Sequence, residues 1–140
     1  MRVAAGLYRG GTSRGLIFSA SDLAMYSQRA REYIICSAMG SPDPDQRQID
    51  GVGGGVSSLS KAAVVSVPSR DRHMDRLSRM GEEWAFPGVP WADDVVRACD
   101  AETGYDAVYR FGQVPVSGGT GIDWSATCGN MMSAVAIHTY

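Results

Sequence analysis

Cys128 stands directly before Gly129-Asn130 and an apolar run over residues 131–137 that is typical of a helix. A cysteine at the start of a helix faces the positive end of the backbone dipole and several unpaired N–H groups. These lower the thiol pKa and make the sulfur a proton carrier or a nucleophile. The same N–H groups can hold a substrate carboxylate. The segment indicates acid–base chemistry beside a bound anion; the alternative is a buried cysteine followed by a Gly-Asn turn.

Lys61 is the only lysine in the chain. It follows a run of glycines and serines over residues 53–60 and precedes an apolar segment over residues 62–67 that predicts a buried strand. Partial burial would depress the lysine pKa and make the amine a general base; the alternative is a surface lysine at a strand end. The preceding run is neither a P-loop nor a Rossmann fingerprint, but its N–H groups and hydroxyls could bind an anion.

A third segment of small residues spans residues 9–15 and reads RGGTSRG. Its glycines let the backbone turn and let a ligand approach closely. Thr12 and Ser13 offer hydroxyl groups, and Arg14 offers a cation. The alternative is a plain hairpin turn between two strands.

Length and composition favour one domain with a single core, because 44% of the 140 residues are hydrophobic. A formal net charge of -2 and scattered basic residues argue against a nucleic-acid partner. No apolar run reaches the length of a membrane span or of a secretion signal, so we expect a cytoplasmic protein with no membrane partner. Three widely spaced cysteines and two isolated histidines predict neither a disulfide framework nor a metal site.

The elements that must position these segments begin with two short strands, over residues 3–8 and 15–18, on either side of a turn. A helix is predicted to begin at Ser21, with this serine as its N-cap, and to end at Gly40. Its buried side is expected to comprise Leu23, Tyr26, Ala30 and Ile34, with Cys36 as a further core residue.

The later part of the chain is less regular. Residues 68–105 mix charges, aromatics and prolines without a clean period, and we interpret them as an insertion. A strand is predicted over residues 106–116 and a turn over residues 117–121. A short strand over residues 122–124 then leads to Cys128.

Taken together, these segments resemble the PrpF family, which groups 2-methylaconitate cis-trans isomerase, 4-oxalomesaconate tautomerase and related proteins. The resemblance covers about residues 5–67 and 105–137, and the motifs keep the family's order. They are RGGTSRG at residues 9–15, GSPDP and RQIDG within residues 40–51, the glycine run that ends in SSLSK at Lys61, the strand from Tyr109 to Val114, and IDWS followed by CGN within residues 122–130. Arg14 stands where the family usually has lysine.

The resemblance implies an α/β (α+β) fold of the diaminopimelate-epimerase-like type. Such a protein has two similar halves, each a curled mixed sheet wrapped around a central helix, with the active site between them. On this basis residues 1–140 are expected to be an incomplete, truncated N-terminal PrpF-like domain, with the insertion at about 68–105 and the C-terminal half absent.

The resemblance also implies cofactor-independent proton transfer on an unsaturated di- or tricarboxylate, giving cis-trans isomerisation or a double-bond shift. It assigns the catalytic roles to Lys61 and Cys128, with neither a cofactor nor a metal ion. The carboxylate-binding positions that it implies are Thr12, Ser13, Ser57, Ser58, Gly129 and Asn130.

Without a second half the pocket would be open to water, so we expect this chain alone to be a weak or inactive isomerase. Its uncovered face would favour self-association or docking. The alternative is a non-catalytic truncated paralogue or a partner of a full-length PrpF-type protein. A third reading, a small anion-binding module, depends on the glycine and serine loops alone.

Overall fold

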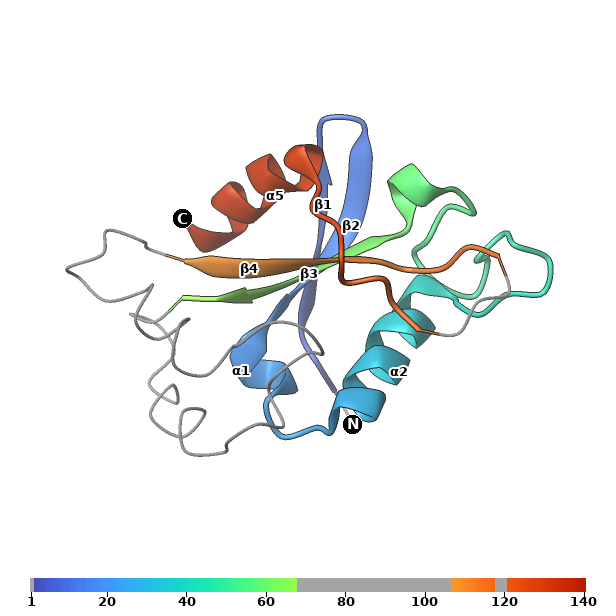
Figure 1. Ribbon diagram of the computed structural model, residues 1–140, viewed down its shortest axis with the longest axis horizontal. Coiled ribbons are helices and arrows are strands. Elements are labelled where there is room, and N and C mark those ends of the chain that lie inside the picture. The colour runs from blue at the N-terminus through green and yellow to red at the C-terminus, as the bar shows by residue number, and fades with distance from the viewer. Residues whose placement is uncertain (1, 68–106, 118–120) are drawn as a thin grey trace.

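The computed structural model describes residues 2–67, 107–117 and 121–140 (Figure 1). The predicted insertion at about 68–105, and Cys99 within it, lie outside the described residues.

The described residues form a mixed α/β structure around one four-stranded sheet in the order β1-β2-β3-β4. The strands are β1 (Ala5–Gly10), β2 (Ser13–Ser19), β3 (Lys61–Ser66) and β4 (Val108–Gln113). The β1–β2 and β3–β4 pairs are antiparallel, and the central β2–β3 pair is parallel. The predicted hairpin, the buried strand after the glycine run and the strand that follows residue 106 are therefore confirmed.

Helices cover both faces of the sheet (Figure 1). The short α1 (Ala20–Leu23) and the longer α2 (Gln28–Met39) lie on one side, and α5 (Gly129–Thr139) lies on the other. A short 3-10 turn, η1 (Ser57–Leu59), precedes β3. This three-layer arrangement means that the central strands are buried on both faces.

Successive side chains of the central strands point to opposite faces of the sheet, which divides the core into two clusters. In β2, Phe18 packs with Ile35 and Met39 of α2, whereas the preceding Ile17 packs with Met131 of α5. Residues 62–65 of β3 are buried throughout and serve both layers in turn. Burying each large apolar side chain in this way contributes about 1.5–3 kcal/mol.

The first helix differs from the prediction. It is broken into α1 and α2, and the N-cap of α2 is Ser27, whose hydroxyl accepts a hydrogen bond from the Ala30 N–H at 3.4 Å. The Arg31 guanidinium donates to the Leu23 carbonyl at 2.9 Å, which satisfies the backbone at the break. The predicted N-cap at Ser21 is wrong, because α1 already begins at Ala20, with Ser19 as its N-cap, and the longer helix begins after Ser27.

The buried side of α2 is also displaced by one residue from the predicted one. Its buried residues are Arg31, Ile35 and Met39, four residues apart, whereas Ala30 and Ile34 are only partly buried. The end of the helix is as predicted, because Gly40 adopts a left-handed φ of 79°. The short strand predicted over residues 122–124 is a single β-bridge, between Gln113 and Asp123.

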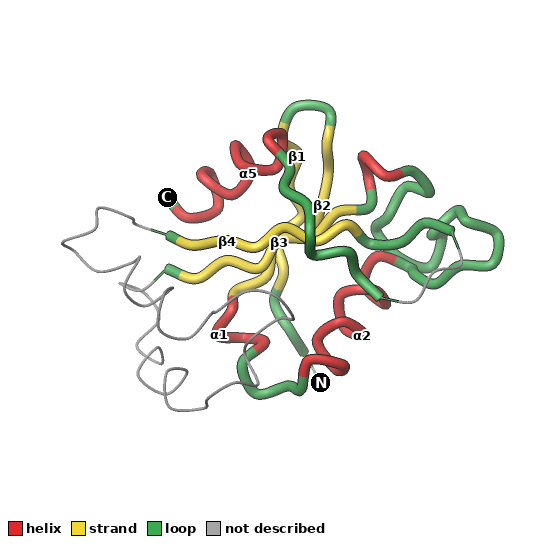
Figure 2. The backbone as a smooth tube through the Cα atoms, in the orientation of Figure 1, coloured by secondary structure: helices red, strands yellow, loops and turns green. Residues whose placement is uncertain are grey.

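The β1–β2 turn, the start of β3, the end of β4 and the start of α5 lie near one another. The turn between β1 and β2 lies beside the first turn of α5 (Figure 2). The first residue of β3, Lys61, pairs with the last residue of β4, Gln113, in the antiparallel ladder. The predicted helix after Cys128 is confirmed as α5, so the three small-residue segments adjoin strands of one sheet or a helix packed on it.

Candidate active site

Cys128 is the N-cap residue of α5. Its backbone is extended, with φ at -134°, and its carbonyl accepts hydrogen bonds from the N–H groups of Met131 at 3.1 Å and Met132 at 3.3 Å. Its thiol sulfur lies 3.7 Å from the hydroxyl oxygen of Ser13, the first residue of β2. The sulfur is therefore held between a helix start and a strand start.

The pKa of the Cys128 thiol is lowered from its ordinary value of 9.0. Burial alone would raise this pKa, but the other contributions outweigh it. Hydrogen bonds from the Met131 N–H, the Ser13 hydroxyl and the Asn130 N–H stabilise the thiolate, as does the positive charge of Lys61. The direction predicted from the sequence is therefore confirmed.

Cys36 in α2 behaves in the opposite way. Burial, and then the negative charge of Glu32, raise the pKa of its thiol to about 11. Its side chain packs against the core on the far side of the sheet from α5. At neutral pH Cys36 is a thiol in an apolar environment, in agreement with its prediction as a core residue.

The turn after β1 is fitted tightly against the start of α5. The Asn130 side-chain amide donates hydrogen bonds to the Thr12 hydroxyl at 3.0 Å and to the Ser13 hydroxyl at 3.4 Å. A Cβ at Gly10 would collide with the backbone oxygen of Asn130, and one at Gly11, where φ is +53°, would lie 2.6 Å from its side-chain oxygen. Glycine is needed at both positions because the two segments approach this closely.

Lys61 opens β3 beside Gly15 of β2. A Cβ at Gly15 would meet the Lys61 carbonyl oxygen, so the missing side chain lets the two strands pair at this point. The Lys61 Nζ donates a hydrogen bond to the Gln113 side-chain oxygen at 2.8 Å and lies 5.0 Å from the centre of the Phe111 ring. Both contacts suit a cationic amine.

Gln113 is a site residue that the sequence analysis missed. Its Nε2 group donates hydrogen bonds to the carbonyl oxygens of Ser60 at 2.9 Å and Ser57 at 3.1 Å. The only signal in the sequence was a polar residue at the end of an apolar strand. Its importance depends on the β3–β4 register, which places it opposite Lys61 and cannot be read from the residues alone.

The loop before β3 is fixed by one carboxylate and one amide. The Asp43 side chain accepts hydrogen bonds from three backbone N–H groups, those of Asp45, Arg47 and Gln48. The buried Gln48 side-chain oxygen accepts hydrogen bonds from the Ser60 hydroxyl at 2.5 Å and the Gly55 N–H at 3.1 Å. These hydrogen bonds fix the backbone of the loop that leads to Lys61.

The structure brings some of the predicted site residues together more closely than others. Thr12, Ser13, Cys128 and Asn130 form one hydrogen-bonded group, and the charge of Lys61 acts on it.

The remaining predicted site residues, Ser57, Ser58 and Gly129, lie outside this hydrogen-bonded group. The carbonyl of Ser57 accepts a hydrogen bond from the Gln113 side chain. Among the described residues, the Ser58 hydroxyl forms no hydrogen bond. A Cβ at Gly129 would meet nothing within 4 Å, so there is open space beside this residue, the first of α5.

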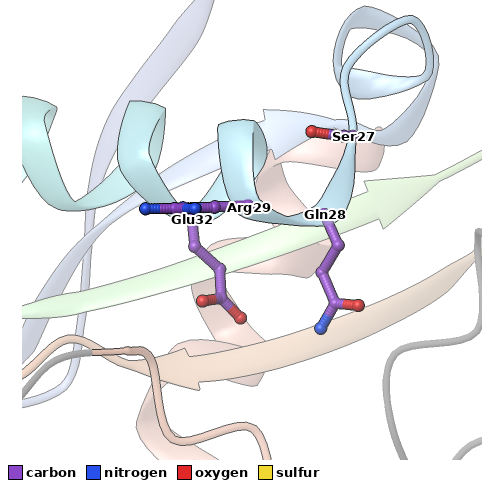
Figure 3. A pocket seen from close by; sticks show the side chains of 4 residues that line it. All are labelled: Ser27, Gln28, Arg29 and Glu32. Carbon is purple, nitrogen blue, oxygen red and sulfur yellow. The ribbon is translucent and has the colours of Figure 1, made fainter.

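A separate pocket of about 450 Å³ lies at the first turn of α2, on the other side of the sheet. Figure 3 shows its four lining residues, Ser27, Gln28, Arg29 and Glu32. In the part of the chain that the structure describes, no three His, Cys, Asp or Glu side chains are grouped to hold a metal ion. Nor does any helix there have the length and apolar character needed to cross a membrane.

Comparisons with known proteins place the chain in a family. The profile of the family described as "PrpF protein" matches residues 1–77. The chain is 34% identical over 138 residues to the 2-methyl-aconitate isomerase of Shewanella oneidensis. This match covers 96% of the chain and 26% of that relative. It is 50% identical over 62 residues to the (4E)-oxalomesaconate Delta-isomerase of a Novosphingobium species, covering 44% of the chain and 16% of the relative.

The fold is also similar to that of a solved structure. The crystal structure of methylitaconate-delta-isomerase superposes with a TM-score of 0.64 and 26% sequence identity, and the match covers 97% of this chain and 26% of that one. The chain therefore spans about a quarter of the length of the relatives that it matches along nearly all of its own residues.

Proposed function

The chain belongs to the PrpF family, and on that premise we propose that it carries the proton-transfer groups of an isomerase for unsaturated di- or tricarboxylates. The relatives that it matches are named as isomerases of 2-methyl-aconitate, oxalomesaconate and methylitaconate. These molecules share an activated carbon next to a carboxylate and a double bond. The chemistry that they require is the removal of one proton and the return of another.

The observation that carries the proposal is the contact between Ser13 and Cys128. The hydroxyl, 3.7 Å from the sulfur, stabilises the thiolate, and the positive charge of Lys61 acts in the same direction. A thiol with a lowered pKa and a nearby ammonium group form an acid–base pair of complementary protonation states. This pairing supports Lys61 and Cys128 as the catalytic residues.

In one direction of the reaction, the Cys128 thiolate takes a proton from a carbon next to a substrate carboxylate, and an S–H bond forms. The electron pair left on carbon is delocalised into the carboxylate and the adjacent double bond. The Lys61 ammonium then gives a proton to a different carbon, which shifts or reorients the double bond. The two side chains have exchanged protonation states, and exchange with water restores them. The proton transfers balance without an oxidant, a reductant or a cofactor.

Substrate carboxylates would be held at the start of α5, where there is open space beside Gly129. The backbone N–H groups of a helix start and its dipole favour an anion there. Thr12, Ser13 and Asn130 already form a polar group at this end of the helix, and the Ser58 hydroxyl is free among the described residues to turn toward a ligand. Negative charge that develops on the substrate would be stabilised by the same donors.

We further propose that the four-stranded sheet and its helices form the N-terminal part of a diaminopimelate-epimerase-like half-domain, with residues 68–105 as an insertion. The match to 26% of the relatives' length supports a pocket completed by a second half, which would cover the partly buried Cys128. Turnover by residues 1–140 alone is expected to be weak, because an open pocket admits water.

The proposal is tested by following isomerisation by proton NMR while the chain is incubated with an unsaturated tricarboxylate such as cis-aconitate or its 2-methyl derivative. Thermal unfolding with and without millimolar ligand measures binding separately. Isomerisation that the Cys128→Ala variant loses supports the enzyme. A ligand-induced rise in Tm without isomerisation would instead indicate an anion-binding module. The absence of both effects favours a non-catalytic partner of a full-length relative and would contradict the proposal.

A further inference from the structure

We propose that Gln113 is a positioning residue that holds the Lys61 amine for proton transfer, an inference that rests on the function proposed above. Gln113 is the last residue of β4, and its backbone lies opposite that of Lys61 in the β3–β4 ladder. Its side-chain oxygen accepts a hydrogen bond from the Lys61 Nζ at 2.8 Å. The backbone register and the side-chain contact therefore join the same two residues.

The orientation of the Gln113 amide follows from its other partners. Its Nε2 group donates to the Ser60 carbonyl at 2.9 Å and the Ser57 carbonyl at 3.1 Å, with a longer contact of 3.4 Å to the Val114 carbonyl. If the amide were turned over, its NH₂ would face the Lys61 ammonium and its oxygen would face these carbonyls. Only one orientation is consistent with all the partners, so the oxygen is fixed toward Lys61.

The backbone of Gln113 also connects the two catalytic residues. On the side away from Lys61, its N–H donates to the Asp123 carbonyl at 2.9 Å and its carbonyl accepts from the Asp123 N–H at 3.0 Å. The segment that contains Asp123 continues to Cys128 at the start of α5. Gln113 thus lies between the strand that starts at Lys61 and the segment that delivers Cys128.

The consequence for Lys61 is a defined position for a flexible side chain. A free lysine amine on its four-carbon chain samples many rotamers. Here one N–H is bonded to Gln113 and the amine lies over the Phe111 ring, which leaves the other N–H groups for the substrate. Gln113 does not transfer a proton itself; it acts through the geometry of Lys61.

The uniqueness of Lys61 allows a test that does not depend on turnover. Because the chain has a single lysine, ¹⁵N-lysine labelling gives one Nζ signal in NMR spectra of the whole chain. A hydrogen bond from an ammonium slows exchange of its protons with water. In Gln113→Met, which keeps the side-chain length but removes the acceptor, we expect this exchange to become about tenfold faster. The matched control is Gln28→Met, which makes the same change in α2 on the far side of the sheet (Figure 3).

A second variant distinguishes loss of the hydrogen-bond acceptor from a general effect of replacing Gln113. Gln113→Glu loses the NH₂ group that bonds the carbonyls but retains an acceptor for Lys61. Because a carboxylate accepts a hydrogen bond from an ammonium more strongly than an amide oxygen does, Lys61 exchange is expected to stay slow. Where isomerisation is measurable, Gln113→Met should lower kcat about tenfold and leave KM within about twofold.

The outcomes separate this inference from the proposed function. Unchanged Lys61 exchange in folded Gln113→Met, or fast exchange in folded Gln113→Glu, would overturn the positioning role even if the wild type is active. Slow wild-type exchange that Gln113→Met abolishes supports that role even if no isomerisation is found, in which case only the proposed function fails.

Discussion

The hydroxyl of Ser13 lies 3.7 Å from the thiol of Cys128, although 115 residues separate them in the sequence. The contact forms because the β1–β2 turn lies against the first turn of α5 on one side of the sheet. Together with the Met131 N–H, which contributes more, the Ser13 hydroxyl lowers the pKa of Cys128, whereas burial and Glu32 raise the pKa of Cys36.

Replacing Ser13 by alanine removes a hydrogen bond that stabilises the Cys128 thiolate. We expect the pKa of Cys128 to rise and its alkylation by iodoacetamide at neutral pH, which lies below the ordinary thiol pKa of 9.0, to slow severalfold. Peptide mass spectrometry separates the modification of Cys128 from that of Cys36 and Cys99. A Cys128 alkylation rate unaffected by Ser13→Ala would show that the contact does not activate the thiol.

The raised pKa of Cys36 predicts a loss of stability at high pH. Because its folded pKa is about 11, above the ordinary value of 9.0, the unfolded state releases the thiol proton first as pH rises. The stabilisation is fully present below pH 9.0 and is lost as pH rises from there through about 11. Urea unfolding between these limits should show a smaller pH-dependent decrease in Cys36→Ala than in the wild type. Equal decreases in both proteins would exclude Cys36 as a cause.

Gly10 is expected to tolerate no side chain. A Cβ there would collide with the backbone oxygen of Asn130, so Gly10→Ala should lower the free energy of unfolding by about 1–3 kcal/mol. Gly129→Ala is the matched control for stability, because its Cβ would meet nothing within 4 Å, and alanine in a helix is favoured by about 0.5–1 kcal/mol. Urea denaturation measures both changes; a Gly10→Ala variant as stable as the wild type would mean that the turn and α5 do not pack this closely.

The comparison of sequence and structure shows which signals are local. The hairpin, the end of the helix at Gly40 and the helix after Cys128 follow from glycines, caps and apolar runs, which act over a few residues. The break between α1 and α2 was missed because it depends on a side chain eight residues away, that of Arg31, which bonds the Leu23 carbonyl.

The candidate site shows the same division. Lys61 and Cys128 stand out by residue type and by their place at the start of a strand and a helix. Gln113 does not, because its role arises from the register between β3 and β4 and from carbonyl groups that only the folded loop brings to it. Contacts of this kind between distant segments are absent from any local pattern.

The central claim, that Cys128 and Lys61 transfer protons at one site, is tested most directly by hydrogen exchange into the substrate. The 140-residue chain is incubated with an unsaturated tricarboxylate in deuterium oxide, and incorporation of deuterium at the carbons next to the carboxylates is followed by NMR. Incorporation by the wild type and by Cys36→Ala, with about 100-fold or greater loss in Cys128→Ala and in Lys61→Met, is the result that the account predicts. Incorporation that persists in both the Cys128→Ala and the Lys61→Met variants would contradict it.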